Sequence, residues 1–205
     1  MVRDVKLGGS IRRQVVAAVF GASVATLVAA SPASAHTGLP ARGVVDGLAH
    51  PLLGLDHLLA MVAVGVLAAT ARNRRIAWLT PIGFIAGMMI GGLLGFAGVD
   101  VPFVEVAIAS SVVVLGTLII GRTENSGLWL PLVAMAFGSM HGYAHGAELP
   151  EGAAPSAYMA GFVASTAALH LSGTALGVAL RRAPAVRIAA GALIASVGVL
   201  VLAGS

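Results

Sequence analysis

Cysteine is absent from this chain of 205 residues, and lysine occurs once, as Lys6. The absence of cysteine excludes disulfides, thiolate metal sites and cysteine nucleophiles, so we expect nitrogen and oxygen atoms to hold any bound metal. A retinal-type pump is also excluded, because its Schiff base needs a lysine inside the helix bundle and Lys6 precedes the first apolar segment.

Charged residues are scarce as well: they make up 10% of the chain, against roughly 25% in an ordinary soluble domain. Hydrophobic residues make up 58%. They fall in blocks of about twenty residues, the length that crosses a hydrocarbon layer. The net charge of +4 does not indicate nucleic-acid binding, because the basic residues precede the first apolar run or lie in short loops.

The N-terminus has the order of a secretory signal: basic residues, an apolar run, and the small residues SPASA before His36. We expect residues 1–35 to be a signal peptide cleaved after Ala35, with an uncleaved seventh helix as the alternative. Residues 36–205 then form one membrane domain. Hydropathy and breaker residues place its six spans at about 46–70, 76–97, 102–121, 128–147, 156–180 and 185–204.

The expected fold class is an all-α membrane protein, a bundle of six transmembrane helices, since lipid offers no partner for bare peptide groups. The first, third and fifth spans are followed by arginines, which indicates that these loops are cytoplasmic. We therefore expect a multi-pass protein of the bacterial inner membrane, with both mature termini external. In the second span, Gly83, Gly87, Gly91 and Gly95 form a stripe that predicts close packing with another helix rather than a gating hinge.

Ionisable side chains inside the predicted spans are the candidate functional residues, because they are costly in lipid. They are His50, Asp56 and His57 in the first span, His141, His145 and Glu148 in the fourth, and His170 in the fifth. Helical spacing puts His50, His57 and Asp46 on one face, and His141, His145 and Glu148 on one face of the other helix. Asp56 points elsewhere on a regular helix; it either orients a neighbouring imidazole or ligates directly if Pro51 and Gly54 distort the helix.

The depths of these residues predict a descending series of metal sites, from His50, His145 and Glu148 on the external side to His170 at mid-membrane or deeper. Two further residues, Glu105 and His36, are candidates at the outer side. Glu105 either stands at the outer mouth of the third span or simply favours a helix N-terminus there. His36 either chelates metal at the entrance or is an unstructured terminus. Imidazole with carboxylate suits nickel, zinc, cobalt or copper, and the ligands alone do not choose among them.

At these residues the sequence resembles the HupE/UreJ family of nickel permeases. HPLLGLDH fits that family's His-x5-Asp-His pattern, and MHGYAHGAE fits its Phe-His-Gly-x-Ala/Val-His-Gly-x-Glu pattern, with Met140 in place of Phe. The resemblance implies nickel uptake, with cobalt or zinc as other cargo, and a link to hydrogenase or urease maturation. His50, Asp56 and His57 match the first motif, and His141, His145 and Glu148 match the second, so the resemblance implies that these residues form the metal path.

These observations predict a transporter, not an enzyme, with no prosthetic group. No ATP-binding motif is present, so transport would be facilitated, proton-coupled or driven by the membrane potential. The alternative is an intramembrane zinc-dependent hydrolase acting on a lipid-like substrate, with Asp56 or Glu148 transferring the proton. The spread of candidate ligands over about half the membrane depth favours a path over one reaction centre. Oligomeric state is left open.

Overall fold

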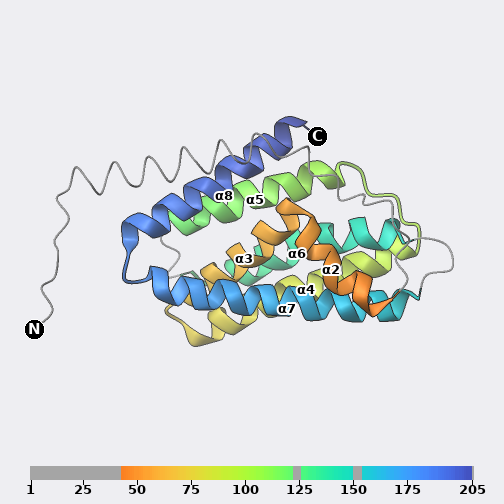
Figure 1. The fold of residues 1–205 in the computed structure, drawn as a ribbon, viewed down its shortest axis with the longest axis horizontal. Coiled ribbons are helices and arrows are strands. Elements are labelled where there is room, and N and C mark those ends of the chain that lie inside the picture. Colours follow the sequence, from red (N-terminus) through yellow and green to blue (C-terminus); the bar gives the residue numbers. More distant parts are fainter. Residues whose placement is uncertain (1–42, 122–125, 150–153, 205) are drawn as a thin grey trace, which may run out of the picture. The chain divides into compact units, whose positions relative to one another are not determined.

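The computed structural model describes residues 43–121, 126–149 and 154–204, and all regular structure in these ranges is α-helical. Its helices are α2 (Val44–Leu53), α3 (Leu55–Thr70), α4 (Arg74–Phe96), α5 (Val104–Ile120), α6 (Trp129–Ala147), α7 (Pro155–Leu180) and α8 (Pro184–Gly204) (Figure 1). The all-helical expectation is confirmed for these residues. The expected signal peptide and His36 lie outside them.

Helices α4 to α8 each begin and end within two residues of a predicted span. The first span is different, because it is two helices, α2 and α3, bent by 87° at Gly54. Pro51 lies inside α2 and has no N–H to continue the helical ladder, and Gly54 has an extended backbone, with φ −93° and ψ 116°. The expectation of one continuous helix over 46–70 was therefore wrong.

Membrane-spanning potential is clearest for α4, α7 and α8, which are long and apolar enough to cross a bilayer. The bent pair of α2 and α3 adds a fourth candidate if it is one broken span. Helix α5 is shorter, with 17 residues. Helix α6 has 19 residues, carries two histidines and is not among the candidate spans. Length and composition thus support up to four of the six predicted crossings.

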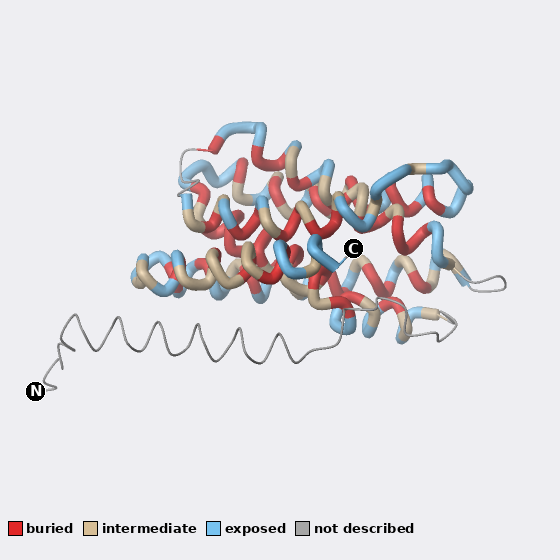
Figure 2. Tube along the Cα trace, turned by 90° about the horizontal axis from the view of Figure 1, so that it is seen from above, coloured by how far each residue is buried: buried red, intermediate tan, exposed pale blue. Residues whose placement is uncertain are grey.

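The outer surface of the bundle is rich in exposed apolar side chains. Val45 is 76% exposed, Leu93 68% and Leu171 66%. Figure 2 shows buried positions on the inner sides of the helices and exposed ones on the outer sides. Contiguous exposed apolar surface is unfavourable in water and favourable against lipid chains, so this surface fits a multi-pass membrane protein.

Glycines allow α4 and α6 to run side by side in the same direction, and this pair has the most extensive contact in the bundle. A Cβ atom at Gly87 would lie 1.9 Å from the carbonyl oxygen of Met135, and one at Gly91 would lie 1.8 Å from that of Ser139. Glycines on α6 make equally close contacts with α4, since a Cβ at Gly142 would lie 1.9 Å from the Met88 carbonyl oxygen. The expectation of close packing along the α4 stripe is confirmed.

Helix α3 occupies the centre of the bundle, where it packs against α7, α5 and α4. Eleven of its 16 residues are buried. Helix α7 runs beside it in the same direction, and α5 pairs with α8. The core therefore forms around α3, whose first turn carries Asp56 and His57.

Arginines cap two helices at one end of the bundle. Arg181 donates to the carbonyl oxygen of Ala69 at the end of α3, and Arg187 donates to that of Ile119 near the end of α5. Unpaired carbonyls at helix C-termini are satisfied in this way, and the positive charge complements the helix dipole. The C-terminal ends of α3, α5 and α7 lie at the same end of the bundle (Figure 1).

Replacing Gly91 with alanine tests the α4–α6 contact. We expect Gly91→Ala to destabilise the folded protein by about 1–3 kcal/mol, because the new methyl group forces two backbones apart. Thermal unfolding of the purified protein in detergent measures this as a lower midpoint. Gly127→Ala is the control, since the nearest atom to a Cβ there is 4.0 Å away. Equal midpoints for both variants would refute close backbone packing at Gly91.

Candidate metal path

Five histidines lie within the described residues, on four helices. His50 is near the end of α2, His57 is in the first turn of α3, His141 and His145 are in the second half of α6, and His170 is in α7. His57, His141, His145 and His170 are at most 3% exposed, and His50 is half-buried. Four imidazoles are thus buried inside the bundle.

Four of these imidazoles form a continuous chain of ring contacts. The ring centroids of His50 and His145 are 4.4 Å apart, those of His145 and His57 are 4.5 Å apart, and those of His57 and His141 are 4.6 Å apart. The spacing of His50 and His57 predicted that they share a face of one helix, but they lie on two helices. Instead, the bend at Gly54 brings both rings against His145.

Asp56 orients the His57 ring. Its carboxylate oxygen Oδ1 accepts the backbone N–H of His57 at 2.7 Å and lies 2.8 Å from Nδ1 of the same ring. An ionised carboxylate only accepts, so the hydrogen of His57 is on Nδ1 and the lone pair is on Nε2. This is the arrangement by which carboxylates commonly orient metal-binding histidines. Of the two roles considered for Asp56, the geometry supports orientation.

Ser111 on α5 orients the His141 ring. Its hydroxyl donates to the carbonyl oxygen of Ile108 at 2.6 Å, and its Oγ lies 3.0 Å from Nε2 of His141. A hydroxyl has one hydrogen, so with that hydrogen on Ile108 its oxygen accepts from Nε2–H. The lone pair of His141 is therefore on Nδ1.

Buried imidazole nitrogens without hydrogen-bond partners are concentrated in this region. They are Nε2 of His57, Nδ1 of His141 and both ring nitrogens of His145 and His170. Only one other buried side-chain nitrogen or oxygen atom in the described residues, Oγ of Ser126, lacks a hydrogen-bond partner. Each such group costs about 1–3 kcal/mol, so a cluster of them indicates a site that a ligand completes.

Comparison with known proteins identifies the family of this chain. Residues 24–201 match the family described as HupE / UreJ protein. The chain is 40% identical over 188 residues to Protein HupE of Rhizobium leguminosarum bv. viciae, an alignment that covers 89% of this chain and 96% of that protein. The chain belongs to the HupE/UreJ family. No solved structure matches it significantly.

The HupE/UreJ chain also surrounds its imidazoles with aromatic rings. Phe162 on α7 is fully buried, and its ring centroid is 4.4 Å from that of His145. Phe84 on α4 stands between His141, at 5.5 Å, and His170, at 5.3 Å. The sequence analysis missed both phenylalanines and Ser111. Ser111 stands in an ordinary apolar stretch, ASSVVV, and phenylalanine is unremarkable in a membrane helix.

Three of the other candidate residues lie at helix ends, and His170 lies within α7. Asp46 is half-buried on α2, and Glu148 is an exposed residue at the C-cap of α6. Glu105 is exposed in the first turn of α5. His170 reaches the other histidines only through Phe84 among the ring contacts. In the part of the chain that the structure describes, no three His, Asp or Glu side chains converge to hold one ion.

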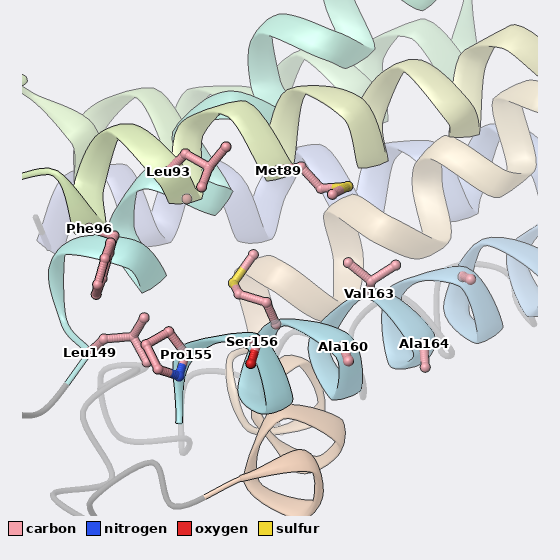
Figure 3. Close-up of a pocket in the computed structure, with 12 residues that line it drawn as sticks. Met89, Leu93, Phe96, Leu149, Pro155, Ser156, Ala160, Val163 and Ala164 are labelled. Atoms are coloured by element: carbon pink, nitrogen blue, oxygen red, sulfur yellow. The ribbon is translucent and has the colours of Figure 1, made fainter. Parts of the chain in front are cut away.

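A separate apolar groove, with a cavity volume of about 770 Å³, lies between α4 and α7 (Figure 3). Met89 and Leu93 line it from α4, and Ala160 and Val163 line it from α7. None of the histidines or acids in the described ranges lines it. The candidate metal path therefore does not run through this groove.

The orientation of the two rings predicts their tautomers. We expect ¹⁵N NMR of histidine-labelled, metal-free protein at neutral pH to show hydrogen on Nδ1 of His57 and on Nε2 of His141. Ser111→Ala removes the oxygen that accepts from Nε2–H of His141, so His141 should no longer favour the tautomer with hydrogen on Nε2. Ser110→Ala, a change at the neighbouring residue, should leave this tautomer favoured. Hydrogen on Nδ1 of His141 in the wild type would contradict this account of the site.

Proposed function

We propose that this protein carries a divalent transition-metal ion, principally nickel, across the bacterial inner membrane. The chain of buried imidazoles with unpartnered nitrogens carries the proposal. Imidazole is a good ligand for nickel, cobalt, copper and zinc, and a poor one for magnesium or calcium. Membership of the HupE/UreJ family supports nickel as the cargo, with delivery to enzymes such as hydrogenase or urease.

The ion moves between pairs of rings. His50 and His145 form the first pair, His145 and His57 the second, and His57 and His141 the third, so each step keeps one ligand and exchanges the other. Conduction needs sites that replace the ion's water and still release it. Pairs of neutral imidazoles bind more weakly than a closed cage of three or four ligands, and this suits transit.

The remaining acids and histidines serve the two ends of this path. Asp46 and Glu148 attract the cation near the half-buried His50, and Glu105 adds negative charge at the start of α5. His36, outside the described residues, supplies a further ligand near the entrance. His170 receives the ion after His141. A divalent ion driven inward by the membrane potential gains about 4–5 kcal/mol per 100 mV, so no ATP is needed.

The hydrolase alternative finds no support. A catalytic zinc site usually has three protein ligands and an open position for water. The described residues contain no such group of His, Asp or Glu, and both comparisons lead to the HupE/UreJ family. We therefore do not retain a zinc-dependent hydrolase as a candidate function.

Uptake of radioactive nickel-63 into cells or proteoliposomes tests the proposal. We expect His57→Ala to abolish uptake, because His57 takes part in two of the three pairs. Asp56→Asn and Ser111→Ala should weaken uptake about 10–100-fold through misorientation of the rings. Ser110→Ala should match the wild type. Cobalt and zinc are added in parallel assays as competitors of nickel uptake, and protein levels are matched between variants. Full uptake by His57→Ala would overturn the proposed path.

Single introduced cysteines test the orientation, and the natural absence of cysteine makes the labelling unambiguous. We expect Asp100→Cys, in the α4–α5 connection, to react with a membrane-impermeant maleimide from outside the inner membrane. Arg72→Cys, in the α3–α4 connection, should react only after the membrane is permeabilised, because arginine-rich loops stay in the cytoplasm. The opposite labelling pattern would reverse the orientation.

A further inference from the structure

The chain of imidazoles has a gap between His141 and His170. Four rings are in continuous contact, but His170 is separated from His141 by Phe84, whose side chain is fully buried. His170 is itself 3% exposed, and neither of its ring nitrogens has a partner. An ion that reaches His141 therefore needs another donor before it can reach His170.

Thr166, Met61 and Met88 meet in this part of the bundle, from α7, α3 and α4. The hydroxyl of Thr166 lies 3.4 Å from the sulfur of Met61 and 3.7 Å from the sulfur of Met88, within hydrogen-bonding range of sulfur. All three residues are 0% exposed. Two thioether sulfurs thus converge on one hydroxyl oxygen in the interior.

The helices place this group at the level of the gap. Helices α3 and α7 run in the same direction, and Gly65 packs against the carbonyl oxygen of His170. Met61 lies one turn after His57 and one turn before Gly65, and Thr166 lies one turn before His170. The thioethers consequently lie between the level of His57 and the level of His170.

The hydroxyl of Thr166 is directed differently from those of several other helical threonines. Thr80, Thr117 and Thr174 each donate to the carbonyl oxygen four residues earlier, at 2.8 Å. This back-bonding is the usual way for a helix to satisfy a threonine in an apolar setting. Thr166 donates instead to sulfur, which is a weak acceptor, so its hydroxyl is held against the two thioethers rather than against the backbone of α7.

We infer that Met61, Met88 and Thr166 form a thioether metal site that passes the ion between His141 and His170. The inference rests on the proposed function and adds soft donors to the nitrogen and oxygen ligands expected from the sequence. Thioethers favour soft or borderline late metals, copper(I) most strongly, and discriminate against hard ions such as magnesium and manganese. The site therefore acts as a selectivity step deep in the bundle.

X-ray absorption spectroscopy tests this site directly. The chain has no cysteine, so any sulfur bound to the metal must come from methionine. We expect the purified protein, loaded with copper(I) and freed of unbound metal, to show metal–sulfur scattering. Met61→Leu and Met88→Leu should weaken or remove it and lower copper(I) affinity by at least about tenfold.

Met89→Leu is the matched control for Met88→Leu. Met89 is the next residue on α4, is 52% exposed and lines the apolar groove (Figure 3), so its replacement should leave the sulfur signal unchanged. Methionine-to-leucine exchanges conserve volume and usually cost less than about 1.5 kcal/mol, so the variants should fold. If either Met61→Leu or Met88→Leu fails to fold, the other variant still shows whether a methionine sulfur binds the metal. A wild type without metal–sulfur scattering, or scattering unchanged in both variants, would overturn the inference.

Nickel uptake separates failure of this site from failure of the proposed function. We expect Met88→Leu to transport nickel more slowly than Met89→Leu and to be inhibited more by manganese. Wild-type nickel uptake together with identical behaviour of Met88→Leu and Met89→Leu would refute the thioether site alone. Absence of nickel uptake in the wild type would refute the proposed function, whereas the copper(I) spectrum would still report whether the thioethers bind metal.

Discussion

The right-angle break at Gly54 is the constraint on which the candidate metal path depends. A straight helix over residues 46–70 would carry His50 and His57 about 10 Å apart along its axis, at 1.5 Å per residue. The break sets α2 across α3, and both rings then reach His145 on α6. Pro51 and Gly54 weaken the helical ladder at this point, so the local sequence and the contact geometry agree.

Tight packing elsewhere holds this arrangement in place. The glycine faces of α4 and α6 bring their backbones together, which fixes the position of His141 and His145 relative to Phe84. The stability gained there has to offset the cost of several buried imidazole nitrogens without partners, each about 1–3 kcal/mol. A bound cation would satisfy the lone pairs of His57 and His141, so the same groups that destabilise the empty protein are suited to its cargo.

Much of the fold was predictable from the sequence, because apolar blocks between breaker residues mark helices well. The bounds of α4 to α8 and the close contact along Gly87 and Gly91 follow from such local patterns. The break in the first span was considered only as a distortion, since proline and glycine also occur in helices that continue. Predictions for residues 1–42 stay predictions.

The site was predictable in its residue types and less so in its geometry. Histidines in a membrane span are conspicuous, and His57, His141 and His145 do meet. Helical spacing alone cannot reveal a partner on another helix, so Ser111 and Phe84 left no signal. Glu148, expected on the same face of the helix as His141 and His145, is the C-cap residue of α6, and its side chain is exposed.

The most direct test of the central claim is a double-mutant cycle on His57 and His141 that measures nickel affinity by calorimetry on the purified protein. If both rings bind one ion, each alanine substitution alone should cause most of the loss, and the double variant should lose much less than the sum of the two single losses. Two losses that simply add, or no loss in either single variant, would contradict a shared ion between these imidazoles.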